Sequence, residues 1–249
     1  KGALMSKATP EPAPAVIIGG GVIGCSLAYH LTKLGWTDVV LLERKQLTSG
    51  TTWHAAGLIA QLRASANMTR LAKYSQELYG RLEEETGIAT GFRRVGSITA
   101  ALTSERHEEL RRSAAMARAF GVEIDEVDTA EIAGKYPHLN TDDVLGGVYL
   151  PKDGQGDPGN IALALAKGAR QRGAVIAERT KATGVTADGD RITQVHWQAE
   201  DGTSGSIEAD HVVNCAGMWG REVGAMLGTG VPLQACEHFY IVSEPIAGL

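Results

Sequence analysis

The chain has few cysteines, no excess of basic residues and no long apolar run. Its 249 residues include three cysteines, none in a C-x-x-C pair, which argues against a disulfide framework and predicts reduced thiols in a cytoplasmic protein. Lys and Arg total 24 against 29 Asp and Glu, a net charge of −5, so no basic surface indicates nucleic-acid binding. The apolar runs are far shorter than the roughly 18 residues of a membrane span. The composition, 43% hydrophobic and 21% charged, is that of a globular chain with a large core.

The sequence also lacks a metal-ligand pattern and an N-terminal signal sequence. No two histidines have the spacing of metal ligands on one helix face, so we expect no metal site. Residues 1–14 are rich in Pro and Ala and contain no apolar signal core, so we expect a disordered leader there.

A glycine-rich motif follows the first apolar run. Residues 15–18 are apolar and mostly β-branched, as in a strand that is buried on both faces of a parallel sheet. Gly19, Gly21 and Gly24 then fit the pattern G-x-G-x-x-G, with Gly20 inside it. In this pattern the first glycine allows a tight turn, the second lets the backbone approach a pyrophosphate, and the third lets the helix pack on the strand.

The next elements are typical of a dinucleotide-binding unit. The spacing predicts a helix over residues 22–34 and a second buried strand over 39–42. Glu43 ends that strand 19 residues after Gly24, where an acid binds the ribose of NAD or FAD rather than NADP. Arg44 either approaches an adenosine phosphate or is a plain surface charge.

A loop of small and hydroxyl-bearing residues around Trp53 and His54 comes next. Such a loop can lie flat against a ring system, and a nicotinamide dehydrogenase would leave it unexplained. By residue type alone, a histidine beside a tryptophan, such as His54, is more often a packed or surface residue than a ligand.

Residues 47–58, LTSGTTWHAAGL, resemble the flavin-attachment motif of the dimethylglycine and sarcosine dehydrogenases and oxidases, which belong to the D-amino-acid-oxidase type of flavoprotein. Residues 26–31, 82–87 and 212–220 are similar to further stretches of that family. The resemblance implies an FAD bonded covalently to His54. It also implies cofactor contacts from the neighbouring residues Gly50, Thr51, Thr52, Trp53, Ala55, Ala56, Gly57 and Leu58.

The expected fold is α/β, with a Rossmann-like FAD-binding domain interleaved with part of an α+β substrate domain. The FAD-binding domain, a parallel sheet with a β-meander insertion, is expected over residues 15–90 and 156–230, and the substrate domain over 91–155 and 231–249. The predicted helices are 71–85, 104–120, 128–136 and 158–172, and the predicted strands are 96–102, 144–150, 175–178, 212–217 and a hairpin around 188–190.

The resemblance assigns roles to four residues in the second half of the chain. Ala182 is expected to contact the adenine side through its backbone, and Gly217 to end a buried strand close to the cofactor. His238 is expected to face the flavin and the amine from a strand over 236–242, with Tyr240 on the same face. By residue type alone, His238 is a packed strand histidine.

The implied activity is oxidation of the N-methyl group of dimethylglycine or sarcosine by hydride transfer to flavin, with oxygen or an electron-transfer flavoprotein as acceptor. Tetrahydrofolate would enter only through a domain that these residues lack, and we expect the rest of a longer polypeptide to be missing. Two alternatives stay open: an oxidase of a longer methylamino acid such as 4-methylaminobutanoate, and a non-catalytic flavin-binding fragment.

Overall fold

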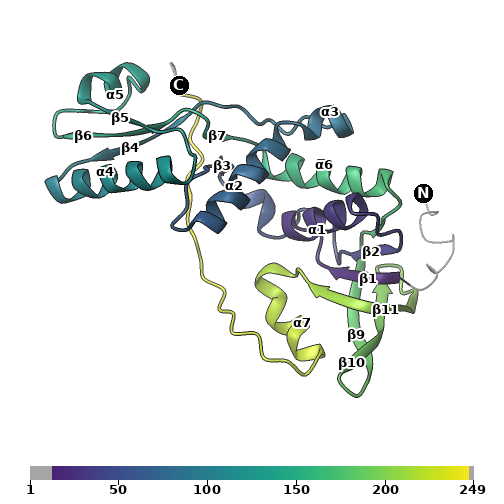
Figure 1. Cartoon of the computed structure of the whole chain (residues 1–249). Coiled ribbons are helices and arrows are strands. Elements are labelled where there is room, and N and C mark those ends of the chain that lie inside the picture. Colours follow the sequence, from purple (N-terminus) through teal and green to yellow (C-terminus); the bar gives the residue numbers. More distant parts are fainter. Residues whose placement is uncertain (1–12, 247–249) are drawn as a thin grey trace. The chain divides into compact units, whose positions relative to one another are not determined.

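The computed structural model describes residues 13–246, which divide into two compact units. Unit 1 comprises residues 13–56, 81–90 and 157–236, and unit 2 comprises 57–80, 91–156 and 237–246. Each unit is therefore assembled from three separate segments of the chain (Figure 1). Residues 57–80, which the sequence prediction grouped with the FAD-binding domain, pack in unit 2.

Unit 1 contains a six-stranded sheet that is parallel in one half and antiparallel in the other. Its strand order is β8-β2-β1-β11-β10-β9. The parallel half comprises β8 (Val175–Ala177), β2 (Val39–Leu42), β1 (Ala13–Ile18) and the end of β11 (Ser204–Asn214). The antiparallel half pairs β11 with β10 (Arg191–Ala199), and β10 with β9 (Thr180–Asp188).

Strand β11 joins the two halves. Its beginning pairs antiparallel with β10 through Glu208, and from Ala209 onward it pairs parallel with β1. The sequence prediction placed a separate strand at 212–217, whereas the structure has one strand that leaves the meander and enters the parallel sheet. The predicted Rossmann-like sheet with a β-meander is confirmed, because the pairing shows both parts.

The helices of unit 1 cover the parallel strands. Helix α1 (Val22–Lys33) packs against α6 (Pro158–Gln171), and strand residues such as Val16 and Leu41 are fully buried. Helix α6 begins as predicted: the Asp157 carboxylate accepts a hydrogen bond from the Asn160 N–H at 2.9 Å, and proline occupies the first turn.

Helix α3 (Leu82–Thr86) is joined to α1 and α6 by one polar cluster. The Tyr29 hydroxyl on α1 donates a hydrogen bond to the Glu85 carboxylate on α3. Arg172, the C-cap of α6, lies 3.4 Å from the same carboxylate, and its guanidinium lies 4.8 Å from the Tyr29 ring centroid. These contacts connect residues 81–90 to the rest of unit 1.

Unit 2 is a smaller α+β unit. Its three-stranded antiparallel sheet has the order β4-β6-β5, and a two-stranded sheet pairs β3 with β7. The elements are β3 (Leu58–Ile59), α2 (Ala66–Tyr79), β4 (Ser97–Ala101), α4 (Ser104–Ala119), β5 (Asp125–Val127), α5 (Thr129–Lys135), β6 (Gly146–Leu150) and β7 (Gly154–Gln155). Its core contains Leu110, Ile132 and Val148.

The predicted helix over 71–85 is wrong as a single element. The structure has α2 from Ala66, capped by Ser65, and a separate α3. Gly80 ends the first helix, and the chain passes from unit 2 to unit 1 at Arg81. Glycine stabilises a helix less than most residues do, which fits a helix end at Gly80. The apolar periodicity of the sequence continues across this break and therefore does not reveal it.

The predicted strand over 236–242 is also wrong. These residues have no regular secondary structure, and the side chains of Phe239 and Ile241 are 85% and 95% exposed. A strand requires neighbouring backbone groups for its hydrogen bonds, and no strand among residues 13–246 pairs with this segment. At the other end, β1 begins at Ala13, two residues inside the predicted leader, whose remaining residues lie outside those described.

Candidate cofactor site

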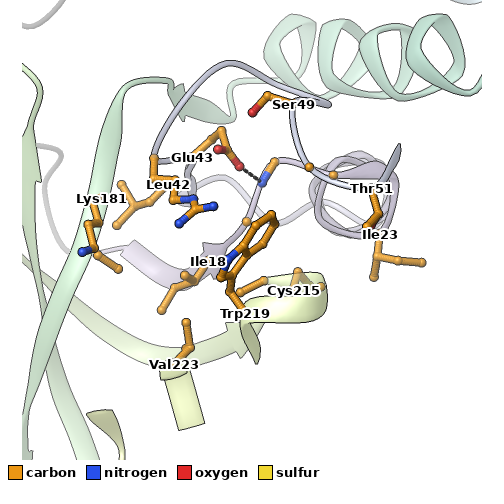
Figure 2. Close-up of a pocket in the computed structure, with 18 of the residues that line it drawn as sticks. Ile18, Ile23, Leu42, Glu43, Ser49, Thr51, Lys181, Cys215, Trp219 and Val223 are labelled. Atoms are coloured by element: carbon orange, nitrogen blue, oxygen red, sulfur yellow. Dashed lines mark hydrogen bonds between the residues drawn. The ribbon is translucent and has the colours of Figure 1, made fainter. Parts of the chain in front are cut away.

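A cavity of about 390 Å³ lies in unit 1, beside the carboxyl ends of β1, β2 and β11. Ligands of open α/β sheets bind at this edge, and the volume is in the range of small-molecule sites. Figure 2 draws most of the lining residues as sticks. The complete lining comprises Ile18, Gly19, Gly20, Gly21, Val22, Ile23, Leu42, Glu43, Arg44, Ser49, Gly50, Thr51, Thr52, Lys181, Ala182, Cys215, Ala216, Gly217, Trp219, Glu222, Val223 and Met226.

Two glycines of the fingerprint have no room for a side chain. Gly19 has φ +115°, and a Cβ there would lie 2.4 Å from the Cys215 carbonyl oxygen. A Cβ on Gly24 would lie 1.9 Å from the Gly19 carbonyl oxygen. The turn after β1 is therefore packed directly against β11 and α1, which leaves the start of α1 at the cavity.

The second glycine of the fingerprint, Gly21, faces a hydroxyl group. Gly21 is the N-cap of α1, and a Cβ there would lie 3.0 Å from Thr52 Oγ1. The Val22 N–H donates a hydrogen bond to that oxygen at 3.0 Å. Thr52 is buried and begins a short 3₁₀ helix, η1 (Thr52–His54). The loop after β2 is thus attached to the start of α1.

Glu43 closes the turn from the opposite side. Its carboxylate accepts hydrogen bonds from the Gly20 N–H at 2.7 Å, dashed in Figure 2, and from the Lys45 N–H at 2.8 Å. A carboxylate has about four acceptor sites, so Glu43 retains acceptor capacity toward the cavity that it lines.

Only the first half of the predicted attachment loop contacts the cavity. Gly50, Thr51 and Thr52 line the cavity, whereas Trp53 and His54 do not. Trp53 is 57% exposed and its ring lies 3.8 Å from that of the exposed His54.

Residues 55–58, the rest of the predicted attachment loop, are mostly exposed to solvent. Ala55 and Ala56 are exposed, and Gly57 and Leu58 belong to unit 2. Gly57 has φ +75°, and Leu58 is 78% exposed at the start of β3. Their roles stay predictions.

Ala182 and Gly217, both predicted from the resemblance, line the cavity. Gly217 has φ +55° and begins a 3₁₀ helix, η2 (Gly217–Trp219), followed by α7 (Gly220–Met226). The sequence reasoning did not assign twelve further lining residues to the site. Seven of them lie in the second half of the chain: Lys181, Cys215, Ala216, Trp219, Glu222, Val223 and Met226. Their proximity to Ala182 and Gly217 in the sequence was the available signal.

The two cysteines of unit 1 near the cavity are protonated thiols. Cys25 is fully buried, and burial raises its pKa to about 12. Burial also raises the pKa of Cys215, which lines the cavity. Because the thiolate is the reactive form, neither group is activated as a nucleophile.

His238 and Tyr240 lie in unit 2, and both are exposed. Tyr240 retains 58% of its accessible surface. The position of His238 and Tyr240 beside a cofactor therefore stays a prediction.

The donor set of the cavity fits a dinucleotide. The start of α1 carries no acidic residue in its first turn, so its N–H groups and dipole favour an anion such as a diphosphate. Gly19, Gly20 and Gly21 line the cavity without side chains, and Glu43 supplies an acceptor suited to ribose hydroxyls. Within residues 13–246, no group of three or more His, Cys, Asp or Glu side chains is placed to hold a metal ion. No helix in the same range is long and apolar enough to cross a membrane.

Three curated proteins show what the chain is similar to. It is 42% identical to human mitochondrial sarcosine dehydrogenase over 245 residues, which are 98% of this chain and 27% of that protein. It is 42% identical to rat mitochondrial dimethylglycine dehydrogenase, over 95% of this chain and 27% of that protein. It is 40% identical to the mouse mitochondrial pyruvate dehydrogenase phosphatase regulatory subunit, over 96% and 27%. The chain thus spans about a quarter of the length of these relatives.

Structural similarity and a family model agree with these matches. L-proline dehydrogenase from P. horikoshii superposes with a TM-score of 0.81 at 28% identity, covering 88% of this chain and 57% of that one. The model of the DAO family of FAD-dependent oxidoreductases matches residues 15–249. The chain belongs to the DAO family of FAD-dependent oxidoreductases.

Proposed function

We propose that this chain is the FAD-binding part of an oxidoreductase that oxidises the N-methyl group of an N-methylated amino acid, dimethylglycine or sarcosine. The observation that carries the proposal is the glycine-lined cavity with Glu43 at the end of β2, in a chain 42% identical to two dehydrogenases of these substrates. The whole protein's activity belongs to the proposal, because the chain spans 27% of those relatives.

The residues present have distinct tasks toward FAD. The N–H groups at the start of α1 bind the diphosphate, and Glu43 binds the adenosine ribose. His54 is the proposed point of covalent attachment. It lies two residues after Thr52, which lines the cavity and accepts a hydrogen bond from the Val22 N–H. FAD held by these residues would supply the acceptor for a hydride from the N-methyl carbon of the substrate.

The proton of the substrate amine requires a second group. The nitrogen lone pair must be free to assist hydride loss, so the amine has to be deprotonated. We assign the removal of this proton to His238, because an imidazole nitrogen can accept a proton as a general base. Tyr240 is proposed to line the binding site of the substrate amine together with His238.

The partners and the compartment follow from the same proposal. Oxygen or an electron-transfer flavoprotein would reoxidise the cofactor, and tetrahydrofolate would require a domain outside these residues. The sequence predicts a cytoplasmic location, whereas the three relatives are named as mitochondrial. Reduced thiols, as in Cys25, Cys215 and Cys236, fit both compartments.

Anaerobic titration of the complete protein tests the proposed activity. We expect sarcosine or dimethylglycine to bleach the flavin absorbance, and an amino acid without an N-methyl group to leave it unchanged. Stronger bleaching by 4-methylaminobutanoate would instead favour the longer substrate.

One relative supports a second candidate function. The similarity to a phosphatase regulatory subunit, 40% over 96% of the chain, fits a flavin-binding protein without amine oxidation. Retained flavin that none of these amines bleaches would favour that candidate and contradict the proposed enzyme.

A further inference from the structure

Trp219 and Arg44 form a stacked pair on the cavity wall of unit 1. The Arg44 guanidinium carbon lies 4.0 Å from the centroid of the Trp219 ring, and both residues line the cavity. Arg44 follows β2, whereas Trp219 is the last residue of η2, 175 positions later in the chain. In Figure 2 the indole of Trp219 lies across the opening below Glu43.

The indole is held by a third segment. A Cβ on Gly50 would lie 3.2 Å from Trp219 Cζ3, closer than most side-chain contacts, so the ring packs against the bare backbone of the loop after β2. Trp219 therefore contacts both ends of the segment that runs from Arg44 to Gly50.

Arg44 has no other partner to fix it. Its side chain is exposed, and among residues 13–246 it makes no hydrogen bond and no ion pair. The adjacent Glu43 carboxylate is bound to the N–H groups of Gly20 and Lys45 instead. An arginine side chain that is free in solution loses rotamer entropy when a ligand orders it. Stacking on an aromatic face removes part of that cost in advance and leaves the N–H edges available.

We propose that Trp219 is a positioning residue that orients Arg44 over the cavity, so that the guanidinium binds the anionic, diphosphate-bearing half of FAD. The inference rests on the proposed binding of FAD in this cavity, and it does not depend on covalent attachment. It decides between the two interpretations that the sequence left open for Arg44, a nucleotide contact and a plain surface charge. Trp219 acts here only through Arg44.

The test uses the complete protein with His54→Ala, so that cofactor binding is reversible, and measures FAD and riboflavin affinities by flavin fluorescence. We expect Trp219→Leu to weaken FAD binding about 3- to 10-fold and to reduce its dependence on salt. Trp219→Phe should restore most of the affinity, because it keeps an aromatic face. Riboflavin, which has no phosphate, should bind all variants equally.

Two comparisons separate positioning from a structural effect. Arg44→Gln should weaken FAD binding as much as Trp219→Leu, and the double variant should lose little more, since both remove one interaction. The control Trp36→Leu, which removes a tryptophan of the same unit outside the cavity lining, should leave FAD affinity unchanged.

Other outcomes would overturn the inference. Equal losses for riboflavin and FAD, fully additive losses in the double variant, or an unaffected Arg44→Gln would each contradict it. Failure of the His54→Ala protein to bind FAD at all would contradict the cavity assignment and this inference together. Acid-extractable flavin in the wild type would contradict only the covalent link.

Discussion

At the residue scale, the turn after β1 requires glycine at positions 19 and 24, because a Cβ at either position would clash with backbone atoms. Gly24 and Gly19 are in contact through a carbonyl oxygen that would lie 1.9 Å from any Cβ at position 24. Backbone carbonyls cannot move aside as the end of a flexible side chain can, so even one methyl group has to displace α1 from β1. The Gly20 N–H, held by Glu43 at 2.7 Å, would shift with it.

We therefore expect Gly24→Ala to lower the free energy of unfolding by about 2 to 3 kcal/mol and to reduce flavin retention. Urea unfolding and flavin content measure the two effects. Gly134→Ala is the matched control, since it adds the same methyl group inside helix α5 with no atom within 4 Å. It should be neutral or stabilising, by up to about 1 kcal/mol. A wild-type midpoint for Gly24→Ala would contradict the close-contact argument.

At the element scale, one hydrogen-bonded cluster holds helices α1, α3 and α6 together. The Tyr29 hydroxyl bonds to Glu85, and Arg172 lies against both. The hydrogen bond from Tyr29, followed by the charges of Lys33 and Arg172, lowers the pKa of Glu85. Burial, with the same hydrogen bond, raises the pKa of Tyr29 from 10.0 to about 12.

These shifts predict how stability depends on pH. A lowered carboxyl pKa stabilises the fold above about pH 4.5, and this contribution is lost as the pH falls below that value. A raised tyrosine pKa stabilises the fold fully below pH 10, and this contribution is lost as the pH rises from about 10 to 12. Tyr29→Phe should cost about 1 kcal/mol at neutral pH and flatten both limbs of the profile.

Thermal unfolding between pH 3 and 11 of wild type, Tyr29→Phe and Glu85→Gln would measure these limbs on the scale of roughly 1.4 kcal/mol per pKa unit. Glu85→Gln should remove the contribution to the acid limb. If stability changed with pH in the same way for wild type and Tyr29→Phe, the cluster would not contribute to the pH dependence of stability.

The elements that the sequence predicted well are those specified by local chemistry. Helix α6 follows from Asp157 and Pro158 at its start, and the β9–β10 hairpin follows from Gly189, which has φ +58°. The break at Gly80 and the unpaired segment at 236–242 depend instead on which distant segments pack or pair. Periodicity carries no information about that choice.

The same distinction applies to the site. Gly19, Gly21 and Glu43 belong to a spaced motif whose mechanics are local, and all three line the cavity. Trp219 reaches the cavity only because β11 lies beside β1. Nothing in the residues around it indicated that it would stack on Arg44.

At the scale of the whole molecule, the two units divide the proposed work. Unit 1 contains the cavity and His54, and unit 2 contains His238 and Tyr240. The attachment loop passes from one unit to the other between Ala56 and Gly57. In the proposed function, unit 1 itself holds FAD, through the cavity and the His54 side chain.

Acid precipitation of the complete protein, with absorption spectra of pellet and supernatant, tests this most directly. We predict a yellow pellet for the wild type. We predict a colourless pellet for His54→Ala, with the flavin released into the supernatant. A wild-type pellet without flavin, or a His54→Ala pellet that keeps its colour, would contradict this proposal.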